Sequence, residues 1–227
     1  SETYDRTLDD VFKVQDEIAS AVVKALSLTL LESEVPKAMP THSQEGYSLF
    51  LQARALHYRG THPDNLTGIS YLERALELDP NYAPAWFGLG DALVYDYVFF
   101  GSGSHDEVRR RANEAAEKAL RLAPDLADAH ILKGRVLCEL DWNYAAGEAE
   151  MRRAVELDSN NTLALWQSSM YAMIGDRLDE ALRFAERMAG IDSVSWGSYQ
   201  AIGDAQWRLG RSAAAAAPPG PRCNGSS

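Results

Sequence analysis

A phrase of seven residues occurs four times along this 227-residue chain, and it limits the fold more than any other feature. In its clearest copy the phrase reads Arg-Ala-Leu-Glu-Leu-Asp-Pro at 74–80, and related copies occupy 118–124, 153–159 and 187–193. The copies end at residues 80, 124, 159 and 193, so their spacings are 44, 35 and 34 residues. Such a period predicts a repeat array in which each unit buries its apolar face only against its neighbours.

Small residues recur at two fixed places in each period. The residues at the eighth place are Ala53, Gly90, Gly134, Ser169 and Gly203. Those at the twentieth place are Gly68, Ala112, Gly147 and Ala181. Since small side chains let two helices approach closely, each period is predicted to be a pair of helices that cross at these residues. The pattern resembles the tetratricopeptide repeat (TPR) family over about residues 46–210.

This resemblance implies an all-α fold, a TPR α-solenoid that winds as a right-handed superhelix of helix-turn-helix repeats. The expected array of about 4.5 repeats occupies 41–211, and its last complete repeat is followed by a single first helix at 196–210. Residues 212–227 are expected to form a disordered tail. The reason is an alanine run at 213–217 that leads into Pro-Pro-Gly-Pro, a sequence that cannot continue a helix.

The second repeat is longer than the others. We predict that its ten extra residues lie in the turn between its two helices, around 96–105. This segment contains the apolar run Tyr97-Val98-Phe99-Phe100, which we expect to be buried. One hypothesis is that this loop folds back over the mouth of the groove described below and partly fills it; an open groove is the alternative.

The segment before the repeats has a helical stripe of its own. Apolar residues at spacings of three or four, among them Val11, Phe12, Ile18 and Val22, predict an amphipathic helix over about 9–31. Prolines then indicate a linker, so that residues 1–40 form either an N-terminal capping helix plus linker or the end of another domain.

A second resemblance favours the other domain. Residues 1–6, Asp10-Val11-Phe12 and 15–19 look like the closing strand and last helix of a TolB-like domain, and Asp141-Trp142-Asn143-Tyr144 is similar to a turn common in the TPR arrays that follow it. The resemblance implies the C-terminal TPR region of a larger bacterial signalling protein. In that class a class III adenylate/guanylate cyclase domain or a winged-helix domain lies upstream.

Composition excludes several classes of function for this region. The net charge of −11 argues against nucleic acid as a partner, because phosphate binding needs a basic face. The sequence contains no run of about 18 apolar residues that would span a membrane. We find no catalytic set, no metal site and no cofactor motif, and we expect a cytoplasmic chain, with a periplasmic location left open.

The resemblance also implies where a partner binds, since the first helices of TPR repeats line the concave face. The residues predicted to form a peptide-binding groove are Phe50, Arg54, Phe87, Asp91, Tyr95, Ile131, Arg135, Trp166, Met170 and Trp207. Met173, Ile174, Asp204 and Arg208 occupy further inward positions. Methionine and aromatic surfaces adapt to apolar peptides and helices, so an apolar partner is expected.

We therefore expect a non-catalytic scaffold for protein–protein interaction, the regulatory or sensory arm of a larger bacterial signalling protein such as an adenylate/guanylate cyclase. Its partner would be a protein, a peptide or the upstream domain of the same chain. Two alternatives remain open at this point. One is a self-association module of a winged-helix transcriptional regulator, which would form a homodimer, and the other is a stand-alone TPR adaptor.

Overall fold

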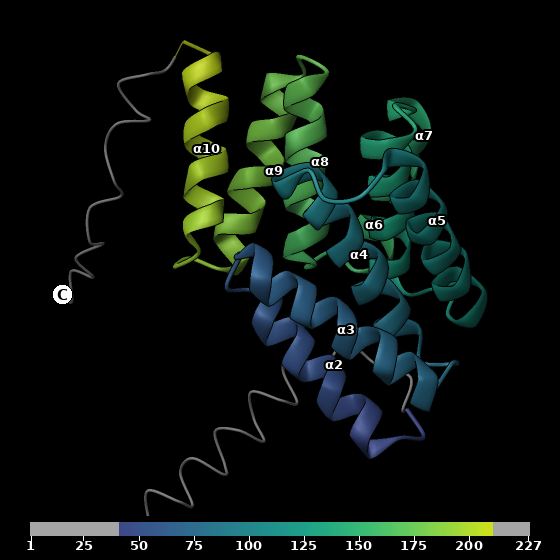
Figure 1. Cartoon of the computed structure of the whole chain (residues 1–227). Coiled ribbons are helices and arrows are strands. Elements are labelled where there is room, and N and C mark those ends of the chain that lie inside the picture. Colours follow the sequence, from purple (N-terminus) through teal and green to yellow (C-terminus); the bar gives the residue numbers. More distant parts are fainter. Residues whose placement is uncertain (1–40, 211–227) are drawn as a thin grey trace, which may run out of the picture. The chain divides into compact units, whose positions relative to one another are not determined.

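The computed structural model describes residues 41–210, and all the regular structure in this part of the chain is helical. The expected helix at 9–31, the TolB-like segment and the tail at 212–227 lie outside the described residues. The helices follow one another as α2 (Gln44–His57), α3 (His62–Leu78), α4 (Ala83–Phe100), α5 (His105–Leu122), α6 (Ala127–Arg135), η1 (Val136–Leu140), α7 (Tyr144–Leu157), α8 (Thr162–Ile174), α9 (Leu178–Ile191) and α10 (Trp196–Arg208) (Figure 1).

These helices form antiparallel pairs, and each pair stacks on the next. The pairs are α2 with α3, α4 with α5, α6 and η1 with α7, and α8 with α9, while α10 packs against α9 and α8. The chain starts many of these helices with a side-chain cap: Ser43, Thr61 and Ser104 each accept a hydrogen bond from a backbone N–H in the first turn. The predicted TPR α-solenoid is confirmed.

The small residues lie where the two helices of a repeat cross. In the third repeat, a Cβ added to Gly147 would fall against Cys138 Sγ and 2.8 Å from the carbonyl oxygen of Gly134. In the fourth repeat, Ser169 and Ala181 take the places of Gly134 and Gly147, and the Ser169 hydroxyl donates to the carbonyl oxygen of Ala181 at 2.9 Å. The backbones therefore approach so closely that a larger side chain has no room.

A left-handed residue reverses the chain after the first helix of the repeats. Gly60, Gly101, Trp142 and Asp176 have φ values of 66°, 68°, 55° and 56°. The third repeat is one residue longer than the fourth, and the extra residue is absorbed by η1, a single π-helical turn that continues α6. Trp142 is thereby held at the turn with its side chain largely exposed.

The prediction that the extra residues of the second repeat form a loop is wrong. The extra residues lengthen the helices instead, so that α4 continues to Phe100 and α5 starts at His105. The prediction that the apolar run is buried is also wrong for three of its four residues, because Val98, Phe99 and Phe100 are exposed. Helix formation satisfies the backbone hydrogen bonds of this segment without any loop crossing the groove.

Among the helices of residues 41–210, none is both long and apolar enough to cross a lipid bilayer.

Candidate functional site

The first helices of the repeats, α2, α4, α6, α8 and α10, form one continuous wall in which each helix contacts the next. The ten predicted groove residues all lie on these helices. Six of them keep part of their side chain at the surface: Arg54, Phe87, Tyr95, Trp166, Met170 and Trp207. Trp207 is the most open, with 68% of its surface exposed.

The other four predicted residues are buried, so they do not present a surface to a partner. Phe50 packs edge-on against Tyr82, with ring centroids 5.2 Å apart, and Ile131 is fully buried between the third and fourth repeats. Asp91 and Arg135 are buried as an ion pair. These positions turn inward because neighbouring first helices pack against each other, and the sequence pattern does not separate this contact from the open groove.

A chain of polar side chains links four consecutive first helices. Its members Asp91, Arg135 and Tyr171 are buried, and His57 and Glu139 are partly buried. His57 Nε2 on α2 lies 3.5 Å from Asp91 on α4, and Asp91 pairs with Arg135 on α6. Arg135 donates two hydrogen bonds of 3.0 Å to Glu139 on η1, and the hydroxyl of Tyr171 on α8 donates to Glu139 at 2.7 Å. Arg135 therefore pairs at once with the buried carboxylate of Asp91 and the partly buried carboxylate of Glu139.

The pKa values of Arg135 and Tyr171, two members of this polar chain, follow from the way it is packed. Burial alone would lower the pKa of Arg135, but Asp91 and Glu139 together outweigh it and raise that pKa above the usual arginine value. Burial, and then the negative charge of Glu139, raise the pKa of the Tyr171 hydroxyl. The charge on Arg135 is thus permanent, and Tyr171 remains a hydrogen-bond donor. The sequence carries a signal for this pair, since the ninth places of repeats two and three, directly after the small residues of the eighth place, hold the oppositely charged Asp91 and Arg135. The repeat pattern nevertheless predicts both residues in the peptide-binding groove.

An apolar depression of about 280 Å³ lies between α8 and α10. Its floor and walls come from Met170, Met173, Ile174 and Trp207, and Asp204 and Arg208 add charged groups. Arg208 also donates to the carbonyl oxygen of Met173 at 3.1 Å. The structure therefore brings together two of the predicted groove residues, Met170 and Trp207, in a hollow that fits an apolar side chain of a partner.

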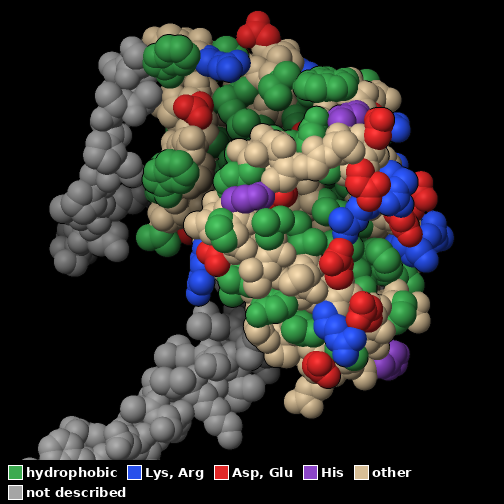
Figure 2. Space-filling model, viewed as in Figure 1, with side chains coloured by type: hydrophobic (Ala, Val, Ile, Leu, Met, Phe, Trp, Pro, Cys, Tyr) green, Lys and Arg blue, Asp and Glu red, His purple; other side chains and the backbone are tan. Residues whose placement is uncertain are grey.

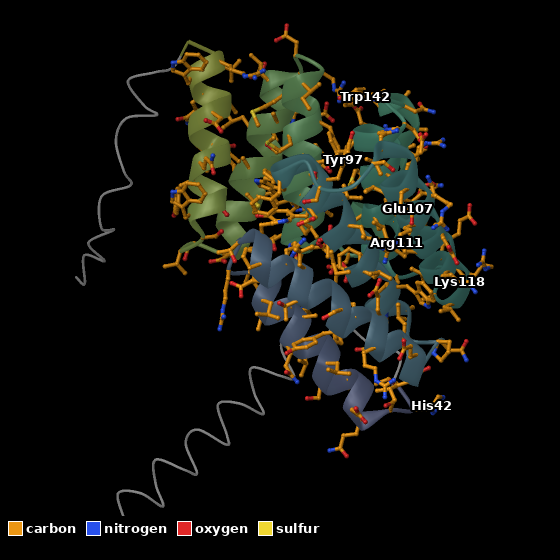
Figure 3. All side chains as sticks on the ribbon, in the orientation of Figure 1. His42, Tyr97, Glu107, Arg111, Lys118 and Trp142 are labelled. Carbon is orange, nitrogen blue, oxygen red and sulfur yellow. The ribbon has the colours of Figure 1, made fainter. Side chains whose placement is uncertain are left out.

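The charged surface lies elsewhere, on the second helices. Glu107, Arg111 and Lys118 extend from α5 (Figure 3), and charged side chains gather over α5 and α7 (Figure 2). Arg111 pairs with Glu73 on α3, and Arg110 pairs with Glu107 at 2.8 Å. The second helices thus present a solvated, ion-paired face, which leaves the first-helix wall as the apolar side of the array.

Aromatic rings cluster where α2 and α4 end. Tyr95 contacts Phe99 and Phe100, with ring centroids 4.6 and 5.8 Å apart, and Phe100 lies 4.9 Å from the ring of His62. His62 Nδ1 is 2.9 Å from the buried carboxylate of Asp96. The two histidines of this region, His57 and His62, therefore face different carboxylates, and no group of three or more metal-ligand side chains occurs within residues 41–210.

Cys138 is a packing residue on η1. Burial, and then the nearby charge of Glu139, raise the pKa of its thiol to about 12. At pH 8 only about one thiol in ten thousand is then ionised, and the thiolate is the reactive form.

We therefore expect that a Cys223→Ser variant, which keeps Cys138, resists iodoacetamide at pH 8 in its native state. The same variant in concentrated urea should be labelled fully, and mass spectrometry counts the added groups. Complete labelling of the native variant within minutes would show that Cys138 is accessible and ionised.

Comparison with known proteins supports the fold and gives a weaker indication of context. No model of a known protein family matches the chain. Among solved structures, TTC0263, a thermophilic TPR protein in Thermus thermophilus, has a TM-score of 0.61 at 17% identity, covering 86% of this chain and 96% of that one. PilF of Pseudomonas aeruginosa has a TM-score of 0.55 at 16% identity, with 76% and 72% covered.

A relative by sequence is described as "Putative adenylate cyclase 3" of Rhizobium meliloti (strain 1021). It is 28% identical over 152 residues, which are 66% of this chain and 25% of the relative. The chain therefore spans about a quarter of that protein's length.

Proposed function

We propose that this chain is a non-catalytic protein-interaction scaffold whose first-helix wall binds an apolar peptide or helix of a protein partner. The observation that carries the proposal is the hollow between α8 and α10, where Met170, Ile174 and Trp207 surround an apolar space. Arg54, Phe87 and Trp166 continue the accessible side chains along the same wall. Such a row suits a peptide that presents bulky apolar side chains at several repeats.

The proposal also places this region in a larger bacterial signalling protein, in the cytoplasm. Its support is the similarity to one quarter of a protein described as an adenylate cyclase, together with the resemblance of residues 1–19 to the end of a TolB-like domain. Any cyclase chemistry would then belong to another part of the protein. Partner binding would regulate that part only by favouring one of two states over the other.

Photo-crosslinking tests the binding wall. With benzoylphenylalanine at position 170, we expect covalent capture of a discrete partner in the cells that make the protein, because a bound apolar side chain would lie within reach of the hollow. The matched control carries the same group at position 152, where Arg152 is exposed on α7. Equal adducts from both positions, or none from position 170, would contradict the proposal.

The captured partner then allows a quantitative test. Met170→Glu places a charge in the hollow, and loss of a well-packed interface side chain typically costs about 2 kcal/mol. Affinity should therefore fall about thirtyfold. Arg152→Glu should leave the affinity unchanged in the same titration.

A further inference from the structure

The outer face of α10 is an apolar stripe with no covering element among residues 41–210. Its inner face is buried through Ser198, Ala201 and Ala205. The residues one helical turn apart on the other side are Trp196, Tyr199, Gly203 and Trp207, and the two tryptophans are 75% and 68% exposed. Figure 2 shows hydrophobic side chains standing on this helix. A helix that is apolar on both faces is usually covered on both.

Gly203 indicates what kind of element covers this stripe. At the same place in repeat two, a Cβ on Gly90 would collide with the side chain of Leu132 on α6 and lie 3.1 Å from Ala115 on α5. In repeat three, a Cβ on Gly134 would lie 2.9 Å from the carbonyl oxygen of Gly147 on α7. The second helix of the same repeat thus covers both glycines, and the first helix of the next repeat also reaches Gly90. A Cβ on Gly203 would meet nothing within 4 Å. The crossing point for a helix is present, and no described residue occupies it.

Residues 211–227 do not have the side chains to fill this place. They contain five alanines, then Pro-Pro-Gly-Pro, and no Leu, Ile, Val, Met or aromatic residue. The alanine run would give about 8 Å of helix before Pro218, whereas the 13 residues of α10 extend about 20 Å.

The stripe is instead complementary to itself. If two copies of α10 cross antiparallel at Gly203, each residue faces the one equally far from Gly203 on the other side. Trp207 then faces Tyr199, both four residues away, and Trp196 faces Gly210, both seven residues away. A large side chain thus meets a ring or an open glycine, and Gln200 faces Gln206 at three residues. The stripe carries no formal charge, so two chains of net charge −11 can meet there.

We propose that a second copy of this chain docks on the outer face of α10, so that two α10 helices cross at Gly203 about a two-fold axis. This surface is distinct from the hollow, although Trp207 borders both. Because the contact is isologous, each copy contributes the same residues, and the assembly closes as a dimer. The contact involves one helix from each copy, so the dimer should dissociate on dilution.

Sedimentation equilibrium of the full chain over a concentration series tests the proposal. We expect the mass to approach twice 25.0 kDa as concentration rises. Gly203→Glu should remain at 25.0 kDa throughout, since it places two like charges at the crossing while fitting the open space of the single chain. The matched control is Gly190→Glu on α9, where an added Cβ also meets nothing within 4 Å, and it should dimerise like the original chain.

Several results would overturn the proposal: a mass of 25.0 kDa for the original chain at every concentration, a dimer that persists in Gly203→Glu, or a monomer that dimerises only when residues 211–227 are removed. The last result would mean that the tail covers the stripe. Met170→Glu should still dimerise, which separates this test from that of the binding wall.

A second experiment fixes the geometry of the crossing. Gly203→Cys in a Cys223→Ser background should form an intermolecular disulfide on mild oxidation, because residues on the two-fold axis face their own copies at the short Cα separation that a disulfide needs. Gly190→Cys in the same background should not. Equal cross-linking of the two variants would contradict the proposed axis.

Discussion

Arg135→Met is expected to destabilise the array by about 3–5 kcal/mol, the range typical for removing one partner of a buried ion pair. The substitution leaves the buried carboxylate of Asp91 and the partly buried carboxylate of Glu139 without their shared cation. It also affects three repeats at once, because Asp91, Arg135 and Tyr171 join α4, α6 and α8 through the polar chain. The shift of the urea unfolding midpoint, followed by circular dichroism, measures the loss.

Arg110→Met is the control for this experiment. Arg110 pairs with Glu107 and Glu114 on the exposed face of α5, where solvent screening leaves an ion pair with little effect on stability. A loss in Arg135→Met no larger than that in Arg110→Met would show that the polar chain does not hold the first helices together.

Gly147→Ala is expected to destabilise the third repeat by about 1–3 kcal/mol, because overpacking forces the backbone to shift. The added methyl group would fall against Cys138 Sγ and lie 2.8 Å from the carbonyl oxygen of Gly134. The carbonyl oxygen of Gly134 belongs to the backbone, so it cannot move away without separating α6 from α7. Thermal and urea unfolding measure the effect.

Gly203→Ala should stabilise the protein, the opposite of the effect expected for Gly147→Ala. Nothing lies within 4 Å of the added methyl group, and alanine favours a helix over glycine by about 1 kcal/mol. The Gly147→Ala and Gly203→Ala variants must be compared at concentrations where the protein is monomeric. Dissociation of the proposed dimer then makes no contribution to the measured free energy of unfolding. Equal changes in the two variants would show that the close crossing in the third repeat is not a packing constraint.

The helical architecture could be predicted because its determinants are local and periodic. Small residues such as Gly134 and Ser169 recur at the crossing points, and α4, α6, α8 and α10 begin at 83, 127, 162 and 196, where the repeat spacing places the first helix of each repeat. The polar caps at Ser43 and Ser104 then define where helices start. A sequence with such a period leaves few ways to bury its apolar faces.

Two features could not be predicted from the same pattern. The run at 97–100 was expected to be buried because it is apolar, but burial of apolar residues is only a tendency. In the structure α4 continues through this run, so its backbone hydrogen bonds are made within the helix. Asp91 and Arg135 were expected in an open groove because they occupy the ninth place of their repeats. Whether such a position faces a ligand or the next helix depends on the distance between helices, which the period does not specify.

The measurement that most directly tests the central proposal, a regulatory region within a larger signalling protein, is the mass of the native protein in the cells that make it, with peptide mapping of whatever precedes Ser1. The proposal predicts a mass well above 25.0 kDa and peptides from a cyclase or winged-helix domain upstream of this sequence. A native mass near 25.0 kDa would contradict it and would leave a stand-alone TPR adaptor.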